Sequence, residues 1–210
     1  GGGVSVGGWG AGGGWGGGAA GWTEAMGERL RARAVAYLQR DGSASGRSFG
    51  SNGSASLHSM IEDVTRLVAQ PGDTVSVYTA WRKAERLADT ADVTLGELGG
   101  GSDFAGFYNH LGIPAFDFGF GGPGGVYHSA YDSYDWMSRF GDPGYLSHAA
   151  AGSLASLMLG RLANADIEPF DYVTFGQGLT RLVAGNRELA EEKGWALPYA
   201  ALATALAQFT

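Results

Sequence analysis

The chain has 210 residues, 44% of them hydrophobic, and a formal net charge of −7 at pH 7, because 21 acidic residues outnumber 14 Lys and Arg. This length is sufficient for one large domain, or for a domain with a smaller partner, around a buried core. The acidic balance and the lack of a basic stripe exclude nucleic acid as the main partner. Because there are no cysteines, any metal must be held by His and carboxylates.

Residues 1–21 are mostly glycine, interrupted by residues such as Trp9 and Trp15. Glycine loses the most conformational freedom on ordering, so this composition predicts a flexible, low-complexity segment. The sequence has no run of about 18 apolar residues and no charged segment ahead of an apolar one. We therefore expect neither a membrane span nor a signal peptide, and the chain reads as soluble.

The first regular elements are expected directly after the glycine-rich segment. A short helix begins at Thr23, a plausible N-cap, and includes Leu30. The apolar run 34–38 predicts a buried strand, and Asp41 follows it in a polar turn. Ligands in open α/β sheets bind just beyond the carboxyl ends of strands, so Asp41 is well placed for a site.

Helical spacing of apolar residues predicts a helix over 57–68, capped by Ser54 or Ser56 and stopped by Pro71. We expect residues 72–95 to be irregular. The remaining elements expected along the chain are a glycine-rich turn at 98–103, a short helix that Gly112 ends, a strand at 113–118, a glycine loop at 119–125, a buried helix at 146–163 and amphipathic helices at 171–193 and 197–208.

One histidine lies in an aromatic, carboxylate-rich stretch, Tyr127-His128-Ser129-Ala130-Tyr131-Asp132-Ser133-Tyr134-Asp135-Trp136. Neutral imidazole is a common zinc ligand, although a lone His beside Tyr and Ser is more often structural. The stretch resembles the segment that ends the zinc site of glutamate carboxypeptidase II and the N-acetylated-alpha-linked acidic dipeptidases. Residues 98–104, 110–114, 140–144 and 162–172 resemble further motifs of that family, in the same order.

This resemblance implies an α/β fold, in which a zinc-aminopeptidase-like open sheet is flanked by helices and followed by part of an α-helical dimerisation domain. The boundaries it implies are 1–166 for the C-terminal part of the peptidase-like domain and 167–210 for the start of the dimerisation domain. The transferrin receptor shares this architecture without the enzymology.

The resemblance also assigns candidate site residues. Residues 35–41 resemble the family's Val-Ala-Tyr-(Ile/Leu)-Asn-x-Asp, which makes Asp41 a zinc ligand, and His128 is the second metal ligand. Tyr127 takes the catalytic role of pointing its hydroxyl at the developing oxyanion. The substrate-binding residues implied are Gly100, Gly101, Ser102 and Tyr127. Asp41 as a loop cap, Tyr127 as a core aromatic and 100–102 as a tight turn remain the alternatives.

Acidic residues of the family are missing from the glycine-rich segment. Trp9 and Trp22 match two tryptophans of the family, but Gly12 and Gly13 stand where it has the general base and a zinc ligand, and its two other ligands have no counterpart. A two-zinc hydrolase needs a bridging carboxylate and about three protein ligands per metal. We therefore expect neither tight zinc binding nor hydrolysis. Either the stretch has decayed, or the recorded sequence departs from the gene there.

Other polar and aromatic residues have simpler interpretations. Glu24 is a first-turn helix acid, since Gly21 replaces the partner with which the family holds calcium. Asp132 and Asp135 either orient the ring of His128 or cap a turn. We expect structural or solvent-facing roles for His58, His110 and His148, and packing roles for Tyr131, Tyr134 and Trp136.

Two classes of function follow from the resemblance. One is a zinc-dependent carboxypeptidase or dipeptidase that uses two zinc ions to release a C-terminal residue from small peptides, acidic ones in the best-known case. The family's arginine-bearing loop, however, has no counterpart in 119–125. The other is a non-catalytic, transferrin-receptor-like scaffold. Both imply a homodimer, and relatives are often membrane-anchored ectodomains. A third possibility is a fragment that does not fold alone.

Overall fold

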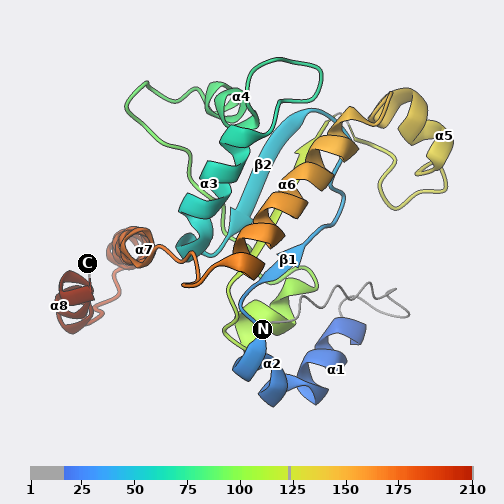
Figure 1. Ribbon diagram of the computed structural model, residues 1–210. Helices are drawn as coiled ribbons and strands as arrows, with labels where there is room; N and C mark the ends of the chain where they lie inside the picture. Colours follow the sequence, from blue (N-terminus) through green and yellow to red (C-terminus); the bar gives the residue numbers. More distant parts are fainter. Residues whose placement is uncertain (1–16, 123, 210) are drawn as a thin grey trace.

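A three-stranded mixed sheet lies at the centre of the computed structural model, which describes residues 17–122 and 124–209 (Figure 1). The strands are β1 (Tyr37–Gln39), β2 (Ser48–Gly53) and β3 (Ala115–Gly121), in the spatial order β1-β3-β2. β3 pairs in parallel with β1 and antiparallel with β2. The glycine-rich segment expected to be flexible lies mainly outside the described residues.

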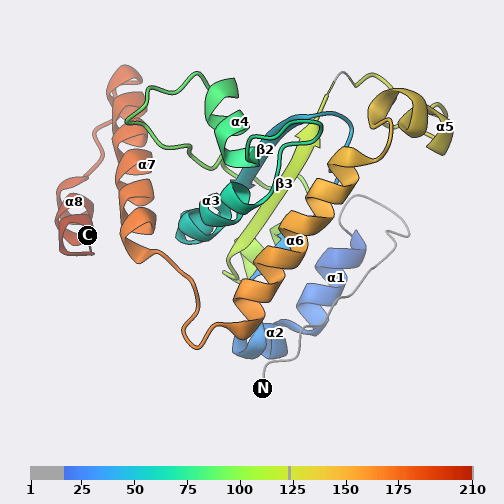
Figure 2. The same ribbon diagram turned by 45° about the horizontal axis from the view of Figure 1, so that its top comes forward.

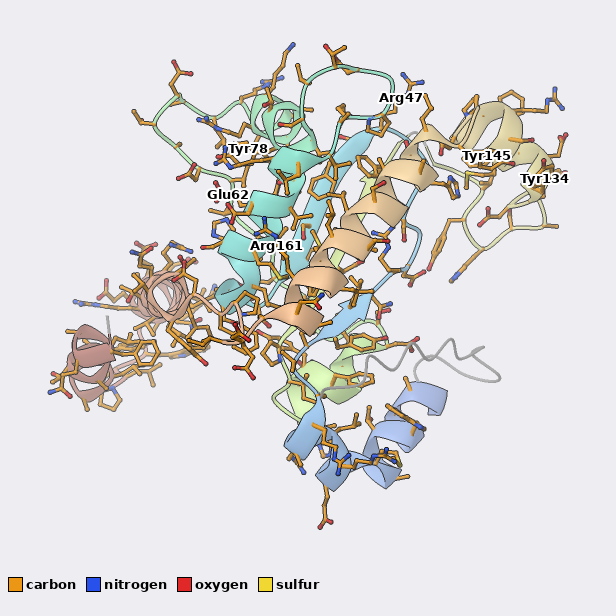
Figure 3. All side chains as sticks on the ribbon, in the orientation of Figure 1. Arg47, Glu62, Tyr78, Tyr134, Tyr145 and Arg161 are labelled. Atoms are coloured by element: carbon orange, nitrogen blue, oxygen red, sulfur yellow. The ribbon has the colours of Figure 1, made fainter. Side chains whose placement is uncertain are left out.

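Three helices cover one face of this sheet (Figures 1 and 2): α3 (His58–Leu67), which follows a 3₁₀ turn η1 (Ala55–Leu57), α4 (Val77–Ala84) and α6 (Leu146–Asn164). Side chains alternate between the two faces along a strand, so β3 sends Phe116, Phe118 and Phe120 into this core. Fully buried Ile61 and Leu154 meet them from α3 and α6. An ion pair between Arg161 of α6 and Asp63 of α3, at 3.2 Å, links the two helices at the surface (Figure 3).

A second, smaller apolar cluster lies beside β1. It joins α1 (Gly17–Ala25), α2 (Gly27–Arg33) and the π-helical turn η2 (Gly106–His110). Its buried members are Phe107, Leu111 and Ile113, and the ring of Tyr37 stacks on Phe107 with centroids 4.0 Å apart. This cluster holds the turn that precedes η2 next to the first strand.

The last two helices, α7 (Tyr172–Glu192) and α8 (Ala200–Phe209), pack on each other and meet the rest of the protein mainly at η1. Figure 2 shows them standing to one side of the sheet. Asp171 caps α7: its carboxylate accepts from the Thr174 amide at 2.9 Å and from the Ser59 hydroxyl at 2.6 Å. Its own amide donates to Ser56 at 2.7 Å. Asp171 thus joins α7 to α3, one of the helices that cover the sheet.

Most expected elements are present, with four corrections. The buried strand predicted over 34–38 is β1 at Tyr37–Gln39: residues 34–36 lie outside it, and Tyr37 and Leu38 are only half-buried. Residues 72–95 are not all irregular, because α4 forms there behind the N-cap Ser76, whose hydroxyl accepts from the Thr79 amide at 3.2 Å. Thr23 is not an N-cap: it is buried inside α1, and its hydroxyl donates to the Ala20 carbonyl. Ser54 precedes η1 without capping it, because its hydroxyl accepts from the Ala115 amide instead.

The region after β3 also differs from expectation. The strand continues to Gly121, into the predicted glycine loop, and residues 126–145 form a projecting aromatic lobe that includes the single turn α5 (Tyr134–Trp136) and a π-helical turn η3 (Met137–Gly141) (Figure 1). Tyr131 and Tyr134 are each 78% exposed, so the packing predicted for them is confined to the lobe, where the Tyr134 ring stacks on Tyr145 with centroids 6.2 Å apart. Within the described residues, no helix combines the length and apolarity that a membrane span requires.

Candidate functional site

The parallel pairing of β1 and β3 brings their carboxyl ends to the same edge of the sheet. Asp41 lies just beyond β1 and is exposed, and residues 124–128 follow β3. Tyr127 and His128 are exposed, with their rings stacked 3.8 Å apart, and His128 has a left-handed backbone with φ of +59°. Asp41 therefore follows β1 at the edge where open α/β sheets bind ligands, whereas His128 comes later in the chain after β3, in the projecting lobe of residues 126–145.

A polar row crosses the face of the sheet opposite the helices. Gln39 of β1, Asp117 of β3 and Asn52 of β2 are paired in register and therefore share this face. The segment that leads to the predicted substrate turn runs along the row, because Gly96 forms a bridge with Asn52. These strand residues were not singled out by the sequence, since only the register between distant strands places them together.

Ser102, a predicted substrate-binding residue, is tied to β1 through Gln39. The side-chain amide of Gln39 donates from Nε2 to Ser102 Oγ at 3.0 Å. Its other end accepts from the Tyr37 hydroxyl at 3.1 Å. Gln39 is only 5% exposed, so its amide has little freedom to exchange partners. The structure thus brings Ser102 to the strand that precedes Asp41.

Carboxylates gather around this network. Burial raises the pKa of Asp117 to about 6; nearby Arg40 opposes the shift and Asp41 adds to it. One oxygen of Asp117, Oδ1, is buried without a hydrogen-bond partner among the described residues. Burial, and then the charges of Asp103, Asp117 and Asp41, raise the pKa of Tyr37 to about 12. The Tyr37 hydroxyl is therefore protonated throughout the neutral range and available as a donor.

Gly100 and Gly101, also predicted to bind substrate, lie in the exposed turn before Ser102. The amide of Asn109 donates to the carbonyl of Gly99 at 3.0 Å and steadies this turn. A Cβ at Gly101 would meet nothing within 4 Å, and one at Gly100 only the end of the Asn109 side chain at 3.4 Å. Internal packing therefore does not demand glycine at either position, and the space beside both backbones is open.

The donor set of the described residues does not by itself fit a two-zinc centre. Within the described residues no three His, Cys, Asp or Glu side chains gather in a way that could hold a metal ion. Asp41 and His128 remain the two candidates, whereas such a centre needs about three protein ligands per ion. Gly12 and Gly13 lie outside the described residues.

The polar residues around the aromatic lobe have structural partners. Asp135 pairs with Arg139 at 3.1 Å within one helical turn. Buried Asp142 accepts from the His148 ring nitrogen Nδ1 at 2.8 Å and from the amides of Ser147 and His148 at the start of α6. Burial alone would raise the pKa of Asp142, but these hydrogen bonds outweigh it and lower the pKa. His148 thus has the structural role expected, and Figure 3 shows Tyr134 and Tyr145 beside each other in the lobe.

The known proteins to which this chain is similar are named as peptidases, which defines its class. The chain is 37% identical over 162 residues to the Probable glutamate carboxypeptidase LAMP1 of Arabidopsis thaliana, which is 76% of this chain and 23% of that protein. It is 37% identical over 161 residues to the Probable glutamate carboxypeptidase VP8 of Zea mays, covering 73% and 21%. It is 29% identical over 193 residues to the Aminopeptidase NAALADL1 of Mus musculus, covering 86% and 26%.

No protein-family model matches the chain. The curated similarities nevertheless agree with the motifs read from the sequence, and the chain belongs to the glutamate carboxypeptidase and N-acetylated-alpha-linked acidic dipeptidase-like family. It spans about a quarter of the length of the relatives it matches. What those whole proteins do is therefore considered for this chain only as a proposal.

Proposed function

We propose that this chain forms the peptide-binding side of a zinc carboxypeptidase- or dipeptidase-like domain and, with the acids it contains, binds a small peptide without hydrolysing it. The observation that carries the proposal is the meeting of the Ser102 turn with the strand that leads to Asp41, through the Gln39–Ser102 hydrogen bond. Tyr127 would supply the hydroxyl that faces the oxyanion, and Asp41 and His128 the metal ligands that remain.

The missing acids are the reason to expect no turnover. A general base contributes roughly 10²- to 10⁴-fold in rate, and glycine at positions 12 and 13 offers no group for that role. With one side-chain ligand left for each zinc ion of the family's pair, neither ion would be held tightly.

The first test measures zinc content of the purified 210-residue chain by mass spectrometry, beside release of the C-terminal residue from N-acetyl dipeptides. We expect substoichiometric zinc and no chelator-sensitive hydrolysis. A Gly12→Glu, Gly13→Glu version is the comparison and is expected to retain more zinc, since one of the added carboxylates is a ligand in the family. Two bound zinc ions with chelator-sensitive activity in the unchanged chain would overturn the ligand count.

A specific observation also favours the scaffold alternative. The helices after Pro169 expose large apolar side chains; those on α7, α8 and their connection are Tyr172, Val173, Leu182, Leu189, Trp195, Leu197, Leu202 and Phe209. Monomeric proteins rarely leave large contiguous apolar patches in water. A second copy of the chain, packed against these helices, would bury them whether or not the protein is an enzyme. Residues 167–210 would then be the start of the dimerisation domain.

A further inference from the structure

The hydrogen bonds among Tyr37, Gln39 and Ser102 all run in one direction. A tyrosine hydroxyl that donates to Gln39 Oε1 fixes that end of the amide as the acceptor. The opposite end, Nε2, is then the donor to Ser102 Oγ. A hydroxyl oxygen that accepts in this way still has its own hydrogen to donate. Gln39 is the side-chain partner that the structure gives the half-buried Ser102 hydroxyl, so this hydrogen remains available to a ligand that displaces water.

The charges nearby restrict what this hydrogen can meet. Asp41, Asp103 and Asp117 lie close enough to Tyr37 for each to raise its pKa, and Asp117 is the direct cross-strand neighbour of Gln39. Arg40, the cation next to Gln39 in sequence, donates to the Phe118 carbonyl at 2.7 Å and lies over the Phe118 ring. An anionic acceptor beside Ser102 would be repelled by the carboxylates, whereas an uncharged carbonyl would not.

Resting on the peptide-binding function proposed above, we propose that Tyr37 and Gln39 are positioning residues that hold the Ser102 hydroxyl as a hydrogen-bond donor to an uncharged carbonyl oxygen of the bound peptide. The peptides selected would be neutral rather than acidic. Ser102 touches the ligand, and the two strand residues act only through it. Because Gln39 is buried and bonded at both ends, the direction of the donor is set before the peptide arrives.

A double-mutant cycle on the 210-residue chain tests the proposal. The probes are N-acetyl-Ala-Ala-amide, which is uncharged, and N-acetyl-Asp-Glu, which is acidic, titrated into ¹⁵N-labelled protein and followed by NMR. A neutral hydrogen bond contributes about 0.5–1.5 kcal/mol, so Ser102→Ala and Gln39→Met should each weaken binding of the uncharged probe roughly 2- to 12-fold. In the Ser102→Ala background, Gln39→Met should have no further effect.

Tyr37→Phe is the milder second variant, because it removes one hydroxyl and keeps the ring against Phe107. It should weaken binding of the uncharged probe less than Gln39→Met and should also lose its effect in the Ser102→Ala background. Melting temperatures measured beside the titrations identify any variant that has lost the fold, and Tyr37→Phe keeps the test decisive if Gln39→Met is one of them.

Each outcome has a distinct meaning. The proposal is supported if the chain binds the uncharged probe more tightly than the acidic probe and if the losses in the double-mutant cycle are not additive. The positioning role of Tyr37 and Gln39 is overturned if the losses are additive, or if Ser102→Ala binds the probe as well as the unchanged chain does. Either result leaves the proposed function standing. Preference for the acidic probe overturns the assignment of an uncharged acceptor. If the unchanged chain binds neither probe, the proposed function is overturned, and the positioning role of Tyr37 and Gln39 in peptide binding is overturned with it.

Discussion

At the scale of single residues, the outer face of the sheet concentrates polar groups that an ordinary core would exclude. Asp117 is the sharpest case, since one of its oxygens is buried without a partner in the described part of the chain. A buried acid without a partner is disfavoured in its charged form. Such a residue lowers the stability of the fold at neutral pH. Residues of this kind are typically retained at functional sites.

Replacing Asp117 by Asn is expected to stabilise the protein at pH 7. The folded-state pKa of about 6 lies above the ordinary value of 3.8 for an aspartate, so the native state binds the proton more tightly. Stability therefore falls as the pH rises from about 4 to 6, and Asp117→Asn removes this fall. The gain at pH 7 should be on the order of 1 kcal/mol, discounted for partial exposure, and should vanish near pH 4.

Urea unfolding of both proteins at pH 4 and pH 7 measures this difference. Asp63→Asn, at an exposed acid of α3, is the matched control and should show a much smaller pH-dependent effect. Equal stability of Asp117→Asn and the unchanged chain at both pH values would mean that the carboxylate is solvated in solution.

At the scale of elements, side-chain hydrogen bonds supplement the packing that holds the C-terminal helices on the α/β unit. α7 meets the sheet-covering helices through η1, and Asp171 accepts hydrogen bonds from both Thr174 at the start of α7 and Ser59 of α3. These bonds, first that of Ser59 and then those of Thr174, lower the pKa of Asp171 to about 2. The Asp171 carboxylate therefore adds a polar link between α7 and α3 to the packing of α7 on η1.

Asp171→Ala is expected to destabilise the protein by about 0.5–2 kcal/mol at neutral pH, the usual value of an N-cap. Because the folded-state pKa is depressed, this contribution is fully present above the ordinary aspartate pKa of 3.8 and is lost as the pH falls toward 2. Thermal unfolding at pH 7 and pH 2.5 measures the change. Asp171→Asn, which keeps an acceptor oxygen, is the control, and equal losses in both variants would show that the charge itself is needed.

At the scale of the whole molecule, the described chain divides into a compact α/β unit and a helical pair with a large apolar surface. The helical pair exposes Leu182 on α7 and Leu202 on α8. If a second copy covers these helices, self-association must depend on that surface and not on other exposed apolar residues. This distinction separates specific dimerisation from non-specific hydrophobic association.

Leu182→Glu should therefore convert a dimer to a monomer in sedimentation velocity, because a charge would be buried at the interface without a partner. Leu67→Glu, at a 62% exposed position of α3, should leave the sedimentation coefficient unchanged. A chain that is monomeric at all concentrations, or a dimer that both variants disrupt equally, would remove the support that the exposed helices give to a scaffold.

The sequence by itself determined the family, most helices and the strand after which Asp41 lies, because these depend on local periodicity and on motifs of neighbouring residues. It missed α4, although Ser76 as a cap and the apolar Val77, Tyr78 and Trp81 carried a readable signal. What only the tertiary structure decided is the hydrogen-bonded arrangement around Ser102, the candidate site. Gln39 and Asp117 become neighbours through strand pairing between distant parts of the chain, and that register leaves no mark in local composition.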